Sequence, residues 1–177
     1  ANWTRIIMSS ELRVDKIIPT GGVPTGGGGG IIQVVESAWS ANFTTSSTSY
    51  VDLTSASITI TPKFITSKIL IQGSINADFA ANDGDLNVVY TKLIRVSDST
   101  EVDEKKFYVG HGASSNGSQY MPLPLNYLAF DSPNTTSAVT YKIQVKLSDA
   151  NNSAQFRNQQ INNGVGQSRL VAMEVSA

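Results

Sequence analysis

The chain has 177 residues and a formal net charge of −1, and only 15% of its residues are charged, against about 25% in a typical soluble domain. This balanced charge excludes broad electrostatic binding of nucleic acid or of an anionic membrane, and no apolar run approaches the roughly 20 residues that cross a bilayer. Because the chain has no cysteine and a single histidine, His111, disulfides and Cys- or His-rich metal sites are excluded, and we expect neither a metal nor a cofactor.

The first 30 residues predict an N-terminal arm and hinge, separate from a head over residues 31–177. Two short apolar clusters, at 5–8 and 12–18, have no partner strand of matching length nearby. Five consecutive glycines follow at 26–30, and their backbone freedom favours a swivel between arm and head. A disordered leader is the alternative interpretation. The residues expected to anchor the arm are Arg5, Ile6, Ile7, Leu12, Val14, Ile17 and Ile18.

Beyond the glycine run, the composition favours β structure. Val, Ile and Thr number 45, whereas the helix formers Ala, Leu, Glu and Lys number 37, and β-branched side chains pack well on pleated surfaces. We predict strands over 31–37, 50–53, 57–61, 68–79, 86–96, 105–109, 120–130, 138–148, 154–158 and 169–175. Turn-forming residues separate them, and no stretch has three turns of helical periodicity. We therefore expect an all-β antiparallel sandwich or jelly roll.

Two of these segments alternate almost perfectly between apolar and polar side chains, so each has one buried face. In 68–79 the apolar set is Ile69, Ile71, Ile75, Ala77 and Phe79, and Leu70 is the one apolar residue on the polar face. In 138–148 the apolar set is Val139, Tyr141, Ile143, Val145 and Leu147. Residues 121–125 include two prolines, which donate no ladder hydrogen bond, so we expect this segment at a sheet edge or in a loop.

The sequence offers little chemistry for catalysis or metal binding. His111 lies in a glycine- and serine-rich segment without a Gly-x-Ser-x-Gly elbow, so a polar contact in a loop is favoured over a hydrolase triad. The oxygen-rich residues within 78–87 lack the spacing of an EF-hand loop, and Asp83-Gly84 is a common hairpin turn, which favours a turn over a calcium site. The tyrosines are expected in core or interface packing rather than as sugar-stacking platforms.

Three segments carry a recognisable family pattern. The first is 10–32, where Leu-Arg-Val-Asp-Lys-Ile leads through Gly-Gly-Val-Pro-Thr to the glycine run. The second is 57–62 with 67–71, and the third is 131–137 with 140–145, closing with Leu-Val-Ala-Met-Glu-Val at 170–175. Together they resemble a family of tailed-bacteriophage virion proteins, especially those of phages of marine bacteria and cyanobacteria. The resemblance covers most of the chain from about residue 10, except for 82–117.

The resemblance implies a trimeric jelly-roll head, of the kind found on tail fibres and capsid decorations, that the N-terminal arm attaches to the particle. We therefore expect a non-enzymatic virion protein of the tail-fibre type at the particle surface, acting in host attachment. Its expected partners are other virion proteins, further copies of itself in a homotrimer, and a host surface glycan. A capsid decoration protein is the alternative. A carbohydrate-active enzyme ranks below both, because no persuasive pair of carboxylates is present.

Two further expectations concern surfaces. Apolar residues on outward strand faces exceed what one monomer needs to cover, which argues for a partner surface; they are Leu70, Tyr90, Leu128 and Phe130. Receptor contacts are expected in the loops 80–87, 110–119 and 151–160. The candidate contact residues are Asn82, Asp83, Asp85, His111, Ser114, Asn116, Asn151 and Asn152.

Overall fold

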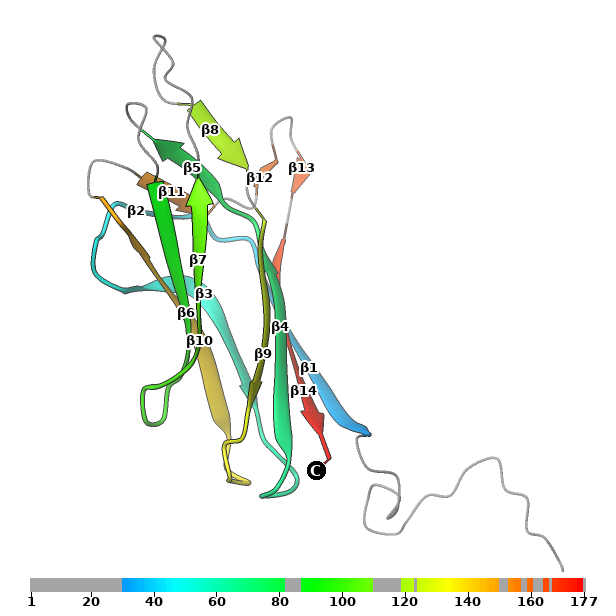
Figure 1. Cartoon of the computed structure of the whole chain (residues 1–177). Coiled ribbons are helices and arrows are strands. Elements are labelled where there is room, and N and C mark those ends of the chain that lie inside the picture. The colour runs from blue at the N-terminus through cyan, green and yellow to red at the C-terminus, as the bar shows by residue number, and fades with distance from the viewer. Residues whose placement is uncertain are drawn as a thin grey trace, which may run out of the picture.

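The computed structural model describes residues 30–81, 87–109, 119–122, 124–149, 153–156, 159–160, 164–165 and 167–176. All the regular elements in these ranges are β-strands, so the predicted all-β class is confirmed (Figure 1). The described segments include no helix that is long and apolar enough to span a membrane.

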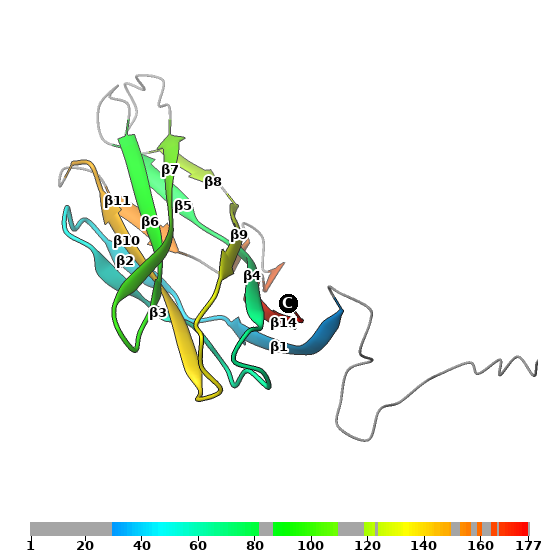
Figure 2. The same ribbon diagram turned by 60° about the horizontal axis from the view of Figure 1, so that its bottom comes forward.

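Two four-stranded antiparallel sheets face each other as a sandwich (Figures 1 and 2). The first has the order β1 (Ile31–Trp39), β14 (Ser168–Val175), β4 (Lys68–Ile75), β9 (Leu125–Asp131). The second has the order β3 (Val51–Ile60), β10 (Val139–Leu147), β6 (Asn87–Arg95), β7 (Thr100–Val109). If the eight long strands are numbered 1 to 8 along the chain, their spatial order is 1-8-3-6 in one sheet and 2-7-4-5 in the other. This order is that of a jelly roll, which confirms the predicted fold.

Shorter strands lie beyond the ends of the long ones. A third sheet has the order β2 (Phe43–Thr45), β11 (Ser153–Phe156), β5 (Asp78–Ala81), β8 (Gln119–Pro122), and β12 (Gln159–Gln160) pairs with β13 (Gly164–Val165). The third sheet lies at one end of the sandwich (Figure 1). Its edge strand is β8, which agrees with the edge position expected for this proline-containing segment.

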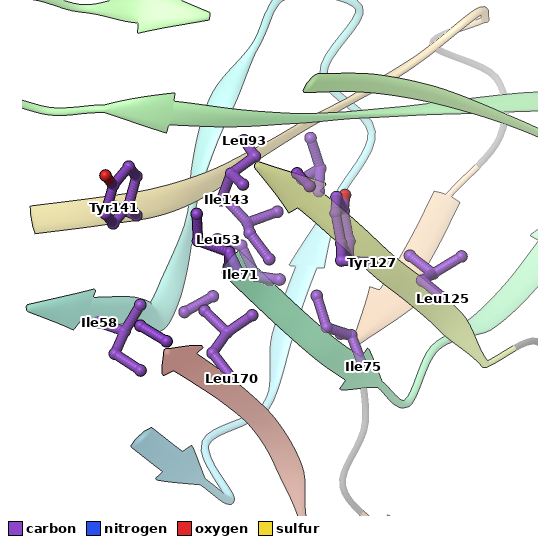
Figure 3. Packing of buried hydrophobic residues seen from close by; sticks show 14 of the residues in the cluster. Leu53, Ile58, Ile71, Ile75, Leu93, Leu125, Tyr127, Tyr141, Ile143 and Leu170 are labelled. Atoms are coloured by element: carbon purple, nitrogen blue, oxygen red, sulfur yellow. The ribbon is translucent and has the colours of Figure 1, made fainter. Parts of the chain in front are cut away.

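Side chains from the two inner faces fill the space between the sheets (Figure 3). Every second residue of β10 is buried, from Val139 to Leu147, and Ile69, Ile71 and Ile75 of β4 are buried in the same alternating way, as the sequence predicted. The largest fully buried side chains come from both sheets: Tyr127, Tyr141, Ile60, Ile69, Ile71, Ile75, Leu93, Leu125, Ile143, Leu147 and Leu170. Each sheet is therefore left with one outer face, and these two faces are the long surfaces of the head.

A bulge joins two predicted strands into one. The segments 50–53 and 57–61 belong to a single strand, β3, whose register against β10 shifts between Lys142 and Gln144. Ser55 lies in this irregular stretch with a φ of 65°. A bulge of this kind places extra residues in one strand without ending its pairing, so the polar stretch that suggested a loop in the sequence lies inside a strand.

Two other predicted strands divide. The segment 68–79 becomes β4 and β5, and at the break the N–H of Asn76 donates to the hydroxyl of Ser168 at 3.1 Å rather than to a ladder carbonyl. The segment 120–130 becomes β8 and β9, which separate next to Pro124. In both places the sequence shows no break in its hydrophobic pattern, but one part of the segment belongs to the first sheet and the other part to the third sheet.

Gly73 gives a test of the packing between strand and core. A Cβ atom at this position would lie 2.4 Å from Cδ2 of Leu170 and 3.0 Å from the carbonyl oxygen of Arg169, and Leu170 is fully buried. Gly73→Ala should therefore destabilise the head by about 1–3 kcal/mol through overpacking, which lowers Tm by roughly 2–4 °C per kcal/mol at this chain length. Thermal denaturation followed by circular dichroism measures the change.

The matched control is Ser74→Ala, one residue along on the exposed face of the same strand. It should change stability by no more than about 0.5 kcal/mol. Equal melting temperatures for the two variants would contradict the close approach of β4 to Leu170.

Candidate interaction surfaces of the head

The described chain begins at one end of the sandwich, where the predicted arm would join it. Gly30, where the described chain begins, accepts a hydrogen bond from the N–H of Ser176 at 3.0 Å, directly after the end of β14. The connections between β3 and β4 and between β9 and β10 lie at this same end (Figure 1). We call it the arm end.

The strands that flank the three predicted contact loops converge at the opposite end (Figure 1). Ala81, in the first predicted loop, pairs with Gln119, at the end of the second. Asn87, at the end of the first, pairs with Val109, just before the second. The third predicted loop, 151–160, contains strands β11 and β12, so the loop prediction is wrong for these residues, and β11 pairs with β5. The described strand ends in and next to the three predicted loops are therefore neighbours, and we call this the loop end.

The individual residues predicted for anchoring and for receptor contact lie outside the described residues. They are Arg5, Ile6, Ile7, Leu12, Val14, Ile17 and Ile18 in the arm, and Asn82, Asp83, Asp85, His111, Ser114, Asn116, Asn151 and Asn152 in the loops. The predicted turn at Asp83-Gly84 lies outside them as well. The roles of these residues, and the division of the chain at residue 30, stay predictions.

The outer face of the second sheet carries interleaved lysine and tyrosine side chains. Lys146 Nζ lies 4.5 Å from the ring centroid of Tyr50 and 4.7 Å from that of Tyr90. Lys92 Nζ lies 4.4 Å from the Tyr50 ring. Lys106 Nζ lies 5.3 Å from the Tyr90 ring. Because ammonium groups occupy these ring faces, Tyr50 and Tyr90 serve in packing, as expected from the sequence, rather than as platforms for a sugar.

Carboxylates on the same face balance the lysines. The Tyr50 hydroxyl donates to Glu104, and Lys92 forms a 2.7 Å ion pair with Glu101. Burial and the hydrogen bond to Glu104 raise the pKa of Tyr50 above its ordinary value, so the phenol keeps its proton at neutral pH. The hydrogen bond from Tyr50 and the neighbouring lysines lower the pKa of Glu104. The face is therefore charged but compensated within itself.

Replacing Tyr50 and, separately, Tyr108 by leucine tests whether Tyr50 stabilises the head through its contacts. Tyr50→Leu removes the contacts to two lysines and the hydrogen bond to Glu104, and should lower the free energy of unfolding by about 1–2 kcal/mol. Tyr108 lies on β7, the other edge strand of the same sheet, with 66% of its surface exposed, and Tyr108→Leu should cost no more than about 0.5 kcal/mol. Urea denaturation of both variants measures the difference, and equal costs would contradict the packing role.

At the arm end, the partly buried guanidinium of Arg95 links the two sheets. Arg95 of β6 donates from Nη1 to both carboxylate oxygens of Asp131 in β9, at 3.0 and 2.8 Å. The same side chain donates from Nη2 to Asp98 at 2.9 Å and to Thr100 at 3.1 Å. The Tyr141 hydroxyl donates to Asp131 at 2.8 Å, and burial together with this hydrogen bond raises the pKa of Tyr141. Since Asp131 belongs to the first sheet and its donors to the second, the cluster holds the sheets together where the apolar core ends.

A second buried carboxylate at this end, Glu174 of β14, fixes the connection between β3 and β4. Its Oε1 accepts hydrogen bonds from the N–H groups of Lys63 and Phe64 at 2.7 and 3.2 Å. Its Oε2 accepts one from the side-chain amide of Gln33 at 2.7 Å. Burial alone would raise the pKa of Glu174, but the hydrogen bonds to the charged form outweigh it and hold the pKa below its ordinary value.

Glu174→Gln places an NH₂ group against these N–H donors, so we expect about 2–3 kcal/mol lower stability near neutral pH, the scale of hydrogen bonds to a charged group. The lowered folded-state pKa means that the wild-type advantage exists above the unfolded pKa of about 4.3 and is lost as the pH falls through the folded value. Urea denaturation from about pH 7 to about pH 3 measures this. A stability difference between the two proteins that does not change with pH would contradict the role of the carboxylate.

The outer face of the first sheet is apolar across all four strands. The register places one residue of each strand in a single row, in the order Val34, Met173, Leu70 and Phe130. Val34 is 58% exposed and Phe130 is 60% exposed. The next row adds Leu128 and Val171, which lie on either side of Gln72. We call the outer surface formed by Val34, Val171, Met173, Leu70, Leu128 and Phe130 the apolar face.

The sequence predicted half of this surface. Leu70, Leu128 and Phe130 were expected on an outward face and lie there, whereas Tyr90, expected with them, lies on the second sheet among lysines. The residues of β1 and β14 were missed because both faces of those strands are largely apolar, so the alternation is weak. Apolar residues on both faces of a strand are the signal that would have located them.

The most enclosed carboxylates of the described head serve structural roles. Asp131 and Glu174 each accept hydrogen bonds from neighbouring elements. Among the described residues, no three His, Cys, Asp or Glu side chains gather where they could hold a metal ion. The described part of the head thus presents two long surfaces, one charged and compensated and the other apolar, as its candidate interaction sites.

Comparison with known proteins gives matches only among solved structures. No family model and no curated protein matches the chain. The chain is similar to VP2 in the subviral particle of infectious bursal disease virus, with 16% identity and a TM-score of 0.33, over 82% of this chain and 37% of that chain. For the Gx strain of the same virus, the values are 13% identity, a TM-score of 0.35, and 82% and 40% coverage. The chain spans less than half the length of these proteins, and the similarity is one of fold.

Proposed function

We propose that this chain is a non-enzymatic structural protein of a tailed-bacteriophage particle, of the tail-fibre or receptor-binding type. Its N-terminal arm attaches it to the particle, and its jelly-roll head faces outward. The phage assignment is supported by the sequence resemblance, which covers most of the chain from about residue 10. The similarity to VP2 is one of fold and adds no weight to this assignment.

The strongest support for the proposal is that the arm end and the loop end lie at opposite ends of the head (Figure 1). Gly30 lies at the arm end, against Ser176, and the strands that flank the three polar loops end together at the loop end. A head attached through residues 1–30 therefore directs the loop end away from the body that holds it. A glycine run at the junction lets the head reorient without unfolding.

The proposed partners follow from the composition of the loops. Asparagine amides, serine hydroxyls and His111 offer both donors and acceptors of hydrogen bonds, which suits the hydroxyl groups of a host surface glycan. Contacts of this kind are weak one at a time. A homotrimer would present three loop ends together, and linked binding sites raise overall avidity by roughly 10²–10⁴-fold without any new contact.

The position of the chain on an intact particle tests the proposal. Antibodies raised against the full chain should label the tail fibres in immunogold electron microscopy. Label confined to the capsid would replace the proposal with the alternative, a capsid decoration protein. Particles that carry no label would overturn both. Release of reducing sugar from host polysaccharide by the purified chain would overturn the non-enzymatic assignment.

Two variants of the phage-encoded chain separate anchoring from receptor binding. Ile17→Asp with Ile18→Asp places two charges in the arm and should reduce particle-bound chain at least about tenfold, because an apolar contact with the particle is lost. Asn151→Ala with Asn152→Ala should leave the chain on the particle and reduce adsorption to host cells. If the arm variant stays on the particle at the wild-type level, the anchoring role of the arm is wrong.

A further inference from the structure

We infer that the apolar face packs against a second copy of this chain, and that this contact holds the homo-oligomer together. The inference rests on the proposed homo-oligomer and names the surface and the residues that form it.

The first observation is the contrast between the two outer faces. Antiparallel sheets that face water on one side carry polar residues there, and the second sheet follows this rule with its lysines, tyrosines and glutamates. The outer face of the first sheet also carries Lys68, Gln72 and Arg169, but an unbroken apolar row crosses all four of its strands. Leu128 and Phe130 are each 60% exposed within one copy. Exposed apolar side chains that adjoin one another across neighbouring strands are typical of a surface that a partner covers.

The second observation is the size of the apolar face. Its row from Val34 to Phe130 crosses all four strands, and the strands are 9, 8, 8 and 7 residues long. With strands roughly 4.8 Å apart and a rise of roughly 3.4 Å per residue, the sheet face covers on the order of 500 Å² in projection. Accessible area exceeds projected area on a corrugated surface. The whole outer face of the first sheet, with the apolar face at its centre and polar residues around it, is therefore comparable in size with the roughly 800 Å² that a stable protein–protein interface buries on each partner.

Charge and shape favour a second copy over another partner. On the outer face, Glu36 and Arg169 form an ion pair with each other, so this pair offers no unbalanced charge that would select a charged partner. A chain with a net charge of −1 is not strongly repelled by its own copy. The bulky Phe130 lies at the β9 edge and the shorter Val34 at the β1 edge. A copy that lays its β9 edge over the β1 edge of the next matches large side chains to small ones.

This arrangement brings Val34 of one copy to Phe130 of the next. In a cyclic trimer whose axis runs along the strands, each copy would contribute its β9 half to one neighbour and its β1 half to the other. All three arm ends would then point the same way, as attachment of three arms to one particle requires. In a twofold dimer whose axis runs along the strands between the two faces, the same two residues meet and the arm ends also point the same way, but each copy then has a single partner, so cross-linking stops at the dimer.

Disulfide cross-linking tests the contact directly, because the natural chain contains no cysteine. The full chain carrying Val34→Cys and Phe130→Cys should give covalent dimers and trimers after mild oxidation, seen on a non-reducing gel. Within one copy the two positions are three strand spacings apart, roughly 14 Å, beyond the limit of about 7 Å between Cα atoms for a disulfide. Each bond must therefore join two copies, and a trimer band distinguishes the threefold arrangement from the twofold one.

The matched control places the cysteines on the edge strands of the second sheet, as Ser57→Cys with Tyr108→Cys. It should stay monomeric on the same gel. Cross-linking of the control with none in the Val34 and Phe130 variant would assign the interface to the other sheet and overturn the inference.

Light scattering coupled to size exclusion gives an independent readout. The wild-type full chain should have a mass that is a multiple of 18.9 kDa. Leu128→Lys with Phe130→Lys should give 18.9 kDa, with an unchanged circular dichroism spectrum to show that the head is folded. Ile65→Lys, at a position equally exposed at 60% but outside the apolar face, should keep the wild-type mass. A monomeric wild type, or a lysine double variant that keeps the oligomeric mass, overturns the inference.

The arm variant tests whether the arm, rather than the apolar face, holds the copies together. The chain with Ile17→Asp and Ile18→Asp should keep the wild-type mass. If it alone dissociates, the arm and not the apolar face holds the copies together, and the inference is wrong. If it keeps its mass and the antibody label is absent from wild-type particles, the proposed virion function fails while the interface stands.

Discussion

The head depends on the burial of alternate side chains between two sheets. Each long strand turns one set of side chains inward, and β10 shows this along its whole length, with five buried positions from Val139 to Leu147. At the arm end, polar groups supplement the apolar core. Arg95 donates hydrogen bonds to Asp131 in the opposite sheet, and Glu174 accepts hydrogen bonds from N–H groups in the connection between β3 and β4. The sandwich is therefore closed by apolar packing along its length and by charged hydrogen bonds at one end.

Because only the inward-facing side chains form the core, the two outer faces can differ in chemistry without affecting it. The second sheet uses this freedom for lysine–tyrosine contacts that balance within the chain. The first sheet uses it for an apolar surface that crosses β1, β14, β4 and β9. One jelly roll thus offers a surface suited to water and another suited to a protein partner, and neither requires a change in the core.

The local part of the fold could be predicted from the sequence. Alternation located β4 and β10 and their buried residues, because period two is a property of each strand alone. The start of β7 was missed because the charged run 101–104 suggests a loop, whereas in the structure it pairs with β6 at the edge of the sheet. The bulge at Ser55 was missed because nothing in a single strand shows that the four residues between Asp52 and Ser57 stand opposite Ile143 alone.

The non-local part could not be predicted in this way. The pairing of β1 with β14 joins the two ends of the head, and no local pattern encodes such a register. The network around Arg95 depends on four segments meeting at one point. The apolar face likewise exists only once four strands are aligned. The candidate anchoring and receptor residues lie outside the described residues, so for them the sequence remains the source of prediction.

The junction at Gly30 determines how the head would carry a mechanical load. The arm continues directly into β1, an edge strand that is hydrogen-bonded to β14 from Ile31 to Trp39. Tension between the arm and an anchored loop end runs along the axis of β1, and ladder hydrogen bonds lie across that axis. The whole ladder is then loaded in shear at the same moment, rather than opening one bond after another from an end. A head joined to its arm in this way resists pulling through geometry, independently of its equilibrium stability.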